Sequence, residues 1–334
     1  MAKNVTMSEI ARDLGVSTVS VSKAITGKDG VSDKVRDMIL KRAEEMGYIY
    51  NKPDKDGTSH NIGIVVGEHF LGSDSFYTDL YQKTLLMLSE KGQIGLLEIV
   101  KKDDEDQAKM PALISSKQVE AVIVLGQMSR NYLEMLKTSE LPLLYMDFYD
   151  EQVREDAVVS DSVYGSAILT NHLIKNGHKD IAFVGSILRT SSIMDRYMGY
   201  VKAMLTAGLE TKAEWLIEDR DESGIGIELK LPNVMPTAFV CNCDATAFEL
   251  IRKLQSMGYK VPEDISVVGF DNFIYSKLCN PKITTYGVDI DALVSNVVTT
   301  IVNKLEDRDY AVGRVVVEGT MIERDSVMNR KGKR

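Results

Sequence analysis

Seven side chains that can bind a small polar molecule follow the apolar, strand-like runs of this 334-residue chain. They comprise aromatic rings, a hydroxyl, carboxylates and an arginine: Phe76, Tyr77, Asp147, Ser192, Arg196, Asp244 and Asp271. Carboxylates and arginine make paired hydrogen bonds to neighbouring hydroxyls, and aromatic rings cover the apolar face of a sugar ring. The set therefore predicts a binding site for a neutral polyol.

Most members of this set also have a purely structural interpretation. Asp244 and Asp271 could each cap a helix that follows a strand. Arg196 could belong to a surface ion pair, and Phe76 and Tyr77 could be core residues. The functional interpretation rests on one rule: in open α/β sheets, ligands bind beyond the carboxyl ends of the strands. All seven residues follow predicted strands, so the rule places them at one site.

The elements that would position these residues alternate along most of the chain. Strands are predicted at 62–67, 94–100, 121–126, 143–147, 181–185, 238–242, 265–271 and 283–288, and helices at 78–91, 105–116, 130–137, 165–176, 194–207, 245–257 and 290–305. This rhythm indicates parallel sheets covered by helices on both faces. Its length favours an α/β fold with two doubly wound lobes, and a single barrel is the alternative.

Signatures of catalysis and of cofactors are missing from the sequence. It contains no phosphate loop, dinucleotide fingerprint or nucleophile elbow, and its four histidines have no metal-ligand spacing. We therefore expect a protein that is not an enzyme and has no cofactor and no metal. Three cysteines, the lack of a membrane-length apolar run and a polar N-terminus favour the cytoplasm.

The N-terminal stretch Asn4 to Ala24 reads as two short helices joined by a tight turn. Gly15 stands at the corner, where a positive φ is favourable, and Ser17 would cap the second helix. That helix presents an outward face of small, hydroxyl-bearing and basic residues, namely Thr18, Val19, Ser22 and Lys23. This pattern is typical of a helix-turn-helix whose second helix enters the major groove of DNA, although an ordinary helical hairpin is the alternative.

A third helix over 31–46 completes a three-helix head, residues 1–50. The charge distribution agrees with a DNA-binding head. Residues 1–52 hold nine Lys/Arg against seven Asp/Glu, whereas the remainder holds 31 against 42 and the whole chain carries −9. An acidic body behind a mildly basic head limits non-specific binding to DNA.

Several motifs together resemble the lactose/galactose-repressor family of bacterial transcription regulators. They are VTMSEIARDLGVSTVSVSKAITG and VSDKVRDMILKRAEEMGY in the head, and LIKNGHKDIAFVG, DRYMGYVKAM, MGYKVPEDISVVGFDN, NPKITTYGVD and IERDSV in the body. The resemblance implies a homodimeric, sequence-specific DNA-binding regulator, a repressor of sugar-use genes, with a body like periplasmic sugar-binding proteins. A small molecule in the cleft of the body would change the affinity for operator DNA.

The resemblance also implies domain boundaries. A linker at 51–61 would lead into the body at 62–334. Its N-lobe would hold 62–159 and 289–319, and its C-lobe 160–287 and 320–330. The alternatives are a solute-binding protein without a role in transcription, a nucleobase-responsive regulator, or an α/β enzyme such as a sugar kinase.

Residue roles follow from the positions that match the family motifs. Thr18, Val19 and Lys23 would contact bases, and the phosphates would be held by Thr6, Ser17, Ser20 and Ser22. Arg196, Asp244 and Asp271 match effector-contacting positions, and Phe76, Tyr77, Asp147 and Ser192 match more loosely. Many members carry Asn or Thr where this chain has Cys243, which weakens hydrogen bonding at that point.

The linker departs most from the family, whose members usually carry P-N-x-x-A-R-x-L there and form a hinge helix with a leucine wedge. Here Gly57 stands at the wedge position, and Pro53 limits a helix to its first turn. We therefore expect no minor-groove wedge and little bending of the DNA. No leucine heptad follows Ser326, so a dimer rather than a tetramer is expected.

Overall fold

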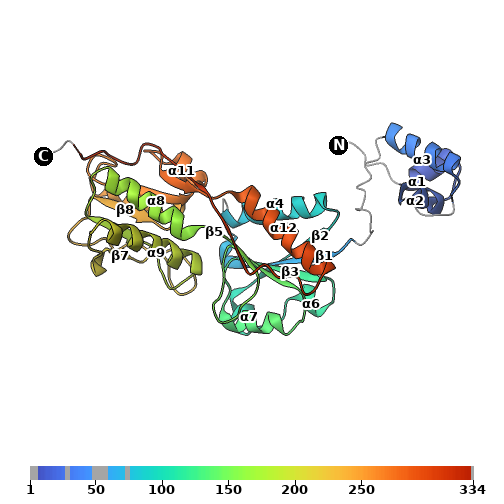
Figure 1. The fold of residues 1–334 in the computed structure, drawn as a ribbon, viewed down its shortest axis with the longest axis horizontal. Coiled ribbons are helices and arrows are strands. Elements are labelled where there is room, and N and C mark those ends of the chain that lie inside the picture. Colours follow the sequence, from blue (N-terminus) through green and yellow to red (C-terminus); the bar gives the residue numbers. More distant parts are fainter. Residues whose placement is uncertain (1–6, 27–30, 47–58, 72–75, 332–334) are drawn as a thin grey trace. The chain divides into compact units, whose positions relative to one another are not determined.

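The computed structural model describes residues 7–26, 31–46, 59–71 and 76–331. Contacts within the chain divide it into a small unit, Met1–Ser59 with Glu90–Gln93, and a large unit, His60–Ser89 with Ile94–Arg334 (Figure 1).

The small unit holds three helices, α1 (Met7–Leu14), α2 (Thr18–Thr26) and α3 (Asp33–Glu45). They enclose one apolar core of Ile10, Ala11, Val21, Ala24, Ile39 and Ala43. Gly15 has a φ of +63°, as the sharp corner requires. Ser17 Oγ accepts a hydrogen bond from the backbone N–H of Ser20 at 3.0 Å, which confirms the predicted cap of α2.

The large unit contains two six-stranded sheets, each the centre of one lobe. The sheet of lobe 1 has the order β11-β5-β4-β3-β1-β2 and is parallel throughout. Its strands are β1 (Asn61–Gly67), β2 (Ile94–Val100), β3 (Ala121–Leu125), β4 (Leu143–Met146), β5 (Ala157–Ser160) and β11 (Arg314–Val317).

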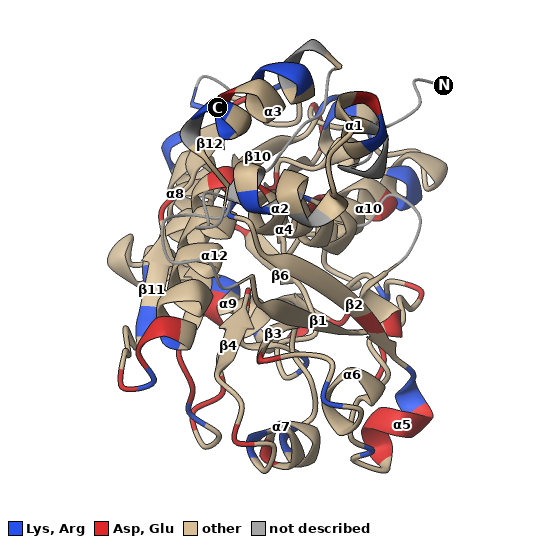
Figure 2. Ribbon diagram, turned by 90° about the vertical axis from the view of Figure 1, so that its right-hand side faces the viewer, with Lys and Arg blue, Asp and Glu red and all other residues tan. Residues whose placement is uncertain are grey.

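Helices cover both faces of this sheet. Alternate residues of β1 point to opposite faces, so Ile64 packs with α4 (Phe76–Glu90) and α12 (Ile290–Glu306), while Val65 packs with α6 (Ala112–Ser115) and α7 (Arg130–Lys137). The short helices η1 (Glu68–Phe70) and α5 (Lys102–Asp106) follow β1 and β2. The strands β1, β3 and β4 carry no charged residue, as Figure 2 shows, which suits a sheet covered on both sides.

The sheet of lobe 2 has the order β12-β10-β9-β8-β6-β7, and only β12 runs antiparallel to its neighbour. Its strands are β6 (Ile181–Val184), β7 (Leu216–Ile217), β8 (Ala238–Cys241), β9 (Ser266–Asp271), β10 (Thr284–Gly287) and β12 (Thr320–Ile322). Helices α8 (Ser162–Lys175) and α9 (Ser191–Thr206) cover one face, and α10 (Asp244–Ser256) covers the other. The short helices η2 (Ala213–Trp215) and α11 (Ile274–Leu278) complete the lobe. The predicted fold class, two doubly wound lobes behind a helical head, is confirmed.

The chain passes between the two lobes three times. It leaves lobe 1 after β5, returns between β10 and α12, and leaves again between β11 and β12. The two lobes are therefore joined by three neighbouring segments rather than by one.

Two predictions about individual elements were wrong or incomplete. The single helix predicted over 105–116 is two short helices, because Ala108 adopts a φ of +47° and Pro111 has no N–H to continue the first. Strands β5, β7, β11 and β12 were not predicted. Of these, β7 and β12 have only two and three residues, too few for a pattern to show in the sequence.

None of the helices in the described part of the chain is long and apolar enough to cross a membrane.

His178 ties the C-terminal segment to lobe 2 and makes its stability depend on pH. Its Nδ1 lies 3.0 Å from Thr237 Oγ1, and its Nε2 lies 3.1 Å from the backbone carbonyl oxygen of Met328. Burial lowers the pKa of His178 to about 4, below its usual value of 6.5. The unfolded chain therefore takes up this proton first, and stability present above pH 6.5 is lost as the pH falls toward 4.

We expect the melting temperature of the full chain to fall between pH 7 and pH 4.5, and to fall less in His178→Gln. His172→Gln is the matched control, because His172 is only half-buried on α8. Circular dichroism melts at several pH values measure both. An identical pH dependence in the wild type and His178→Gln would contradict this assignment.

Candidate effector and DNA-binding sites

Six of the seven predicted effector residues line one cavity of about 320 Å³ in the large unit. They are Phe76, Tyr77, Asp147, Ser192, Arg196 and Asp271. The lining comes from both lobes and gathers beyond the carboxyl ends of β1, β4, β6, β8 and β9. The strand-end rule therefore collects side chains that are far apart in the sequence.

Two carboxylates, one from each lobe, face this cavity; Asp147 is buried, and the side chain of Asp271 is 9% exposed. Asp147 follows β4 and Asp271 ends β9, and both have positive φ values, +67° and +103°. Such a backbone is unusual for non-glycine residues and is concentrated at functional sites. Tyr77 donates its hydroxyl to Asp147 Oδ2 at 3.0 Å.

Asp271 is short of hydrogen-bond donors. Arg196 Nη2 lies 3.2 Å from its Oδ1, close enough for an ion pair, but the geometry leaves that buried oxygen without a hydrogen bond. Burial raises the pKa of Asp271 to about 7, against the lowering effect of Arg196 and with the help of the nearby Asp147. Burial also raises the pKa of Asp147. A ligand that donates hydrogen bonds would satisfy both groups.

Arg196 is held firmly in the floor of the cavity. It is 5% exposed, its Nη1 donates to the carbonyl oxygen of Asn242 at 2.5 Å, and its guanidinium lies 3.9 Å from the centroid of the Phe270 ring. These contacts rule out the alternative of a surface ion pair.

Asp244 is the one predicted effector residue that does not line the cavity. It is fully buried at the start of α10, and its carboxylate accepts hydrogen bonds from Phe273 N and Thr285 Oγ1, both at 2.7 Å. Burial and the neighbouring Asp271 raise the pKa of Asp244 to about 8. The cap of α10 is Cys243, whose Sγ accepts from Thr246 N. Asp244 thus positions the loop that carries Asp271 and Phe273.

Aromatic rings from both lobes flank the carboxylates. Phe76 and Phe273 meet edge to face with their centroids 6.4 Å apart, and Phe70 lies 4.4 Å from Tyr77. Ser192 Oγ lies 3.0 Å from Thr190 Oγ1 beside them.

The sequence interpretation missed other lining residues, among them His69, Phe70, Thr190, Arg220, Asn242, Phe273 and Tyr275. Phe273 and Tyr275 directly follow Asp271, so the strand-end rule could have found them. Arg220 follows β7, a strand of only two residues that leaves no signal.

Arg220 is anchored by a neighbouring carboxylate. Its Nη2 donates to Asp219 Oδ2 at 2.7 Å and to Asn242 Oδ1 at 3.1 Å. Although burial raises the pKa of Asp219, the hydrogen bond and charge of Arg220 outweigh burial and lower that pKa to about 2. The pair therefore stays ionised at neutral pH, and the guanidinium is fixed at the cavity wall.

The lobes also contact each other directly at the start of α9. Ser191 N donates to Gln127 Oε1 at 2.7 Å, and Tyr149 N donates to Ser191 Oγ at 3.2 Å. The Tyr149 hydroxyl donates to Asp195 Oδ1 at 2.9 Å. We call these four residues the interlobe contact. Two of them, Ser191 and Asp195, lie on α9 together with Ser192 and Arg196.

The structure describes part of the predicted DNA-binding surface. Ser17 and Thr18 are exposed, while Ser20 and Lys23 are half-buried. Ser17 Oγ and Ser20 Oγ lie 2.9 Å apart, so the two hydroxyls predicted to hold phosphates share one spot at the start of α2. Thr6, the side chains of Val19 and Ser22, and most of the linker, including Pro53 and Gly57, lie outside the described residues.

A helix-turn-helix head joined to a two-lobed body with an interlobe ligand cavity defines the class of ligand-responsive transcription regulators. The model of the lacI family of bacterial regulatory proteins matches residues 6–51, and that of the periplasmic binding protein-like domain matches residues 170–327. These two matches confirm the resemblance found in the motifs: the chain carries a LacI-type DNA-binding region and a periplasmic binding protein-like domain.

Similar proteins match most of the length of the chain. An HTH-type transcriptional repressor PurR of Aliivibrio fischeri is 27% identical over 97% of this chain and 99% of its own. A protein of the same description from Histophilus somni is 28% identical over 84% of this chain and 86% of its own. The lac repressor dimer bound to operator and an anti-inducer shares the fold, with a TM-score of 0.73 at 19% identity, over 98% of this chain and all of that one. A CelR–cellobiose complex has a TM-score of 0.70 at 21% identity over 97% of this chain. The chain is a DNA-binding transcription repressor with a ligand-binding body.

Proposed function

We propose that this repressor responds to a neutral polyol, in the simplest case a sugar, bound between its two lobes. The observation that carries the proposal is the pair of buried carboxylates, Asp147 and Asp271, facing a cavity with Arg196 between aromatic rings. Hydroxyl groups can donate to the carboxylates and accept from the arginine, and Phe76 and Phe273 cover apolar ring faces.

Two similar structures support a sugar as the effector class. One is a CelR–cellobiose complex, and another is a LacI-family regulator from Enterococcus faecium with bound ribose, at 20% identity and a TM-score of 0.66. A nucleobase is the second candidate, because a flat ring would also fit beside Phe76 and Phe273. A thermal-shift screen over sugars and nucleobases separates the two, since a ligand of the folded state raises its melting temperature.

The proposal also covers the oligomeric state of the repressor and its place in the cell. The repressor acts as a homodimer in the cytoplasm and catalyses no reaction. Exposed apolar side chains on neighbouring elements support the dimer: Leu86 on α4 is 65% exposed, and Ile94 and Ile99 on β2 are each 51% exposed. A second copy of the chain would remove this surface from water.

The head reads DNA through α2, with Thr18, Val19 and Lys23 on the bases and Thr6, Ser17, Ser20 and Ser22 on the phosphates. We expect Lys23→Ala to weaken binding to a promoter fragment from upstream of the protein's own gene by about tenfold, ~1.4 kcal/mol. Gel shifts at several salt concentrations measure this. Lys41→Ala, which removes an exposed lysine of α3 outside the predicted surface, is the matched control.

Equal affinities of Lys23→Ala and the wild type would place the base-reading surface elsewhere. Failure of the wild type to bind any such fragment at low salt would remove the DNA-reading role from this head.

A further inference from the structure

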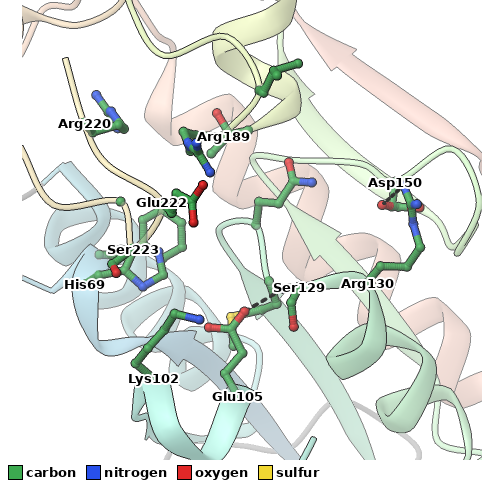
Figure 3. A pocket seen from close by; sticks show the side chains of 16 residues that line it. His69, Lys102, Glu105, Ser129, Arg130, Asp150, Arg189, Arg220, Glu222 and Ser223 are labelled. Atoms are coloured by element: carbon green, nitrogen blue, oxygen red, sulfur yellow. Dashed lines mark hydrogen bonds and ion pairs between the residues drawn. The ribbon is translucent and has the colours of Figure 1, made fainter. Parts of the chain in front are cut away.

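A second cavity of about 300 Å³ adjoins the first. The two share four lining residues, His69, Phe70, Thr190 and Arg220, of which Figure 3 labels His69 and Arg220. The site between the lobes is therefore a two-chambered space rather than a single pocket.

One wall of the second cavity is a hairpin-like loop of lobe 2, residues 219–226. Arg220 and Gly226 form a β-bridge, and Asp221 Oδ1 accepts hydrogen bonds from Ser223 N at 2.8 Å and from Ile225 N at 3.0 Å. Gly224 has a φ of +79°, and a Cβ added there would lie 3.1 Å from His69 Cδ2. Hydrogen bonds within the loop therefore fix its shape, and the loop fits closely against His69 of lobe 1. In this position Glu222 and Ser223 of the loop line the cavity.

The opposite wall comes from lobe 1, and hydrogen bonds fix its side chains as well. Glu105 is buried, and its Oε1 accepts from Ser129 N at 2.6 Å, the dashed line in Figure 3. Arg130 Nη2 lies 3.4 Å from Asp150 Oδ2, and both residues also line the cavity.

The charges around this cavity nearly cancel. The basic side chains are Lys102, Arg130, Arg189 and Arg220, and the acidic ones are Glu105, Asp150 and Glu222. The lining thus offers both hydrogen-bond donors and acceptors, as a hydroxyl-rich unit requires, and its three carboxylates oppose a phosphate or carboxylate ligand.

His69 stands where the two cavities join. Burial lowers its pKa from 6.5, so the ring is neutral at pH 7 and offers one donor and one acceptor. Such a group can hydrogen-bond an oxygen that links two sugar rings as well as the hydroxyls on either side.

We infer that the second cavity is a further ligand subsite, and that the effector consists of two linked polyol units, a disaccharide or a glycoside of similar size. The first unit lies against Asp147, Arg196 and Asp271, and the second lies between the 219–226 loop and Glu105. This inference rests on the proposed function, because it extends the same interlobe site.

The test is isothermal titration of the full-length protein with defined probes: glucose, galactose, ribose, cellobiose, maltose, lactose and glucose 6-phosphate. We expect one disaccharide to bind at least ~10-fold more tightly than either of its component monosaccharides. Arg189→Ala and Glu222→Gln should each weaken that disaccharide by ~10-fold and leave monosaccharide binding unchanged. Arg252→Ala, an exposed arginine of α10 outside both cavities, is the control.

Three outcomes would overturn the inference. In the first, a monosaccharide binds as tightly as every disaccharide, or Arg189→Ala and Glu222→Gln change the affinities for disaccharides and monosaccharides equally. The second cavity is then no subsite, while the sugar-binding proposal stands. If glucose 6-phosphate binds most tightly and Arg189→Ala alone weakens it, the subsite takes an anion. If no probe binds, the polyol proposal fails with it.

Discussion

Replacing Asp271 with asparagine is expected to weaken effector binding by about 100-fold, ~2.7 kcal/mol, while the protein stays folded. The carboxylate is buried, faces the cavity and has an oxygen without a hydrogen bond, so a ligand gains a charged acceptor there. Asparagine keeps the shape and tolerates the positive φ of this position, but it replaces one acceptor oxygen with a donor. Titration with the saccharide that gives the largest thermal shift measures the loss.

The same variant should change the pH dependence of stability. Because the pKa of Asp271 is raised from 3.8 to about 7 in the folded protein, the stability it contributes is full below about pH 4 and is lost as the pH rises through about 7. The wild type should therefore melt at a lower temperature at pH 9 than at pH 6, and Asp271→Asn should lose less over that range. Asp180→Asn, a substitution of an exposed aspartate of lobe 2, is the control. Unchanged affinity together with an unchanged pH dependence would show that Asp271 does not face the ligand.

A large loss of stability is expected from Gly199→Val, where helices α8 and α9 touch. A Cβ at Gly199 would lie 2.2 Å from the backbone carbonyl oxygen of Val163 and 3.0 Å from Ala167 N. These are backbone atoms of a helix and cannot move aside, so the two helices must separate. We expect the free energy of unfolding of the large unit to fall by ~3 kcal/mol.

Urea unfolding of the full chain measures this effect. Met198→Val is the matched control, because it places a β-branched residue on the neighbouring, exposed position of the same helix and should cost less than ~1 kcal/mol. Equal losses in the two variants would mean that helix propensity, rather than the close contact of α8 and α9, limits the residue at 199.

The main features of fold and site were accessible from the sequence because they follow from long-range rules. Buried parallel strands are continuous apolar runs, and their ends must meet at one edge, which is why Asp147, Arg196 and Asp271 could be grouped from positions far apart. Their role in binding the effector stays a prediction.

The orientation of Asp244 and the second cavity depend on local backbone geometry, which leaves no periodic pattern in the sequence. The sequence neighbours of Asp244, Cys243 and Ala245, line the cavity. The first turn of α10, however, directs the Asp244 carboxylate toward Phe273 N and Thr285 Oγ1. The second cavity depends on the loop 219–226, which has neither helix nor strand periodicity and is ordered by Asp221 and a β-bridge.

The interlobe contact at the start of α9 has a consequence for signalling. Ser191 and Asp195 on this helix bind Gln127 and Tyr149 of lobe 1, and Arg196 on the next position faces Asp271. One helix therefore carries both hydrogen bonds that join the lobes and a side chain that lines the first cavity. Coupling between two equilibria is reciprocal. If effector binding stabilises the interlobe contact by some free energy, forming the contact increases the effector affinity by the same free energy. The protein can thus tune its sensitivity to the effector at Gln127 and Tyr149, without altering a single side chain of the first cavity.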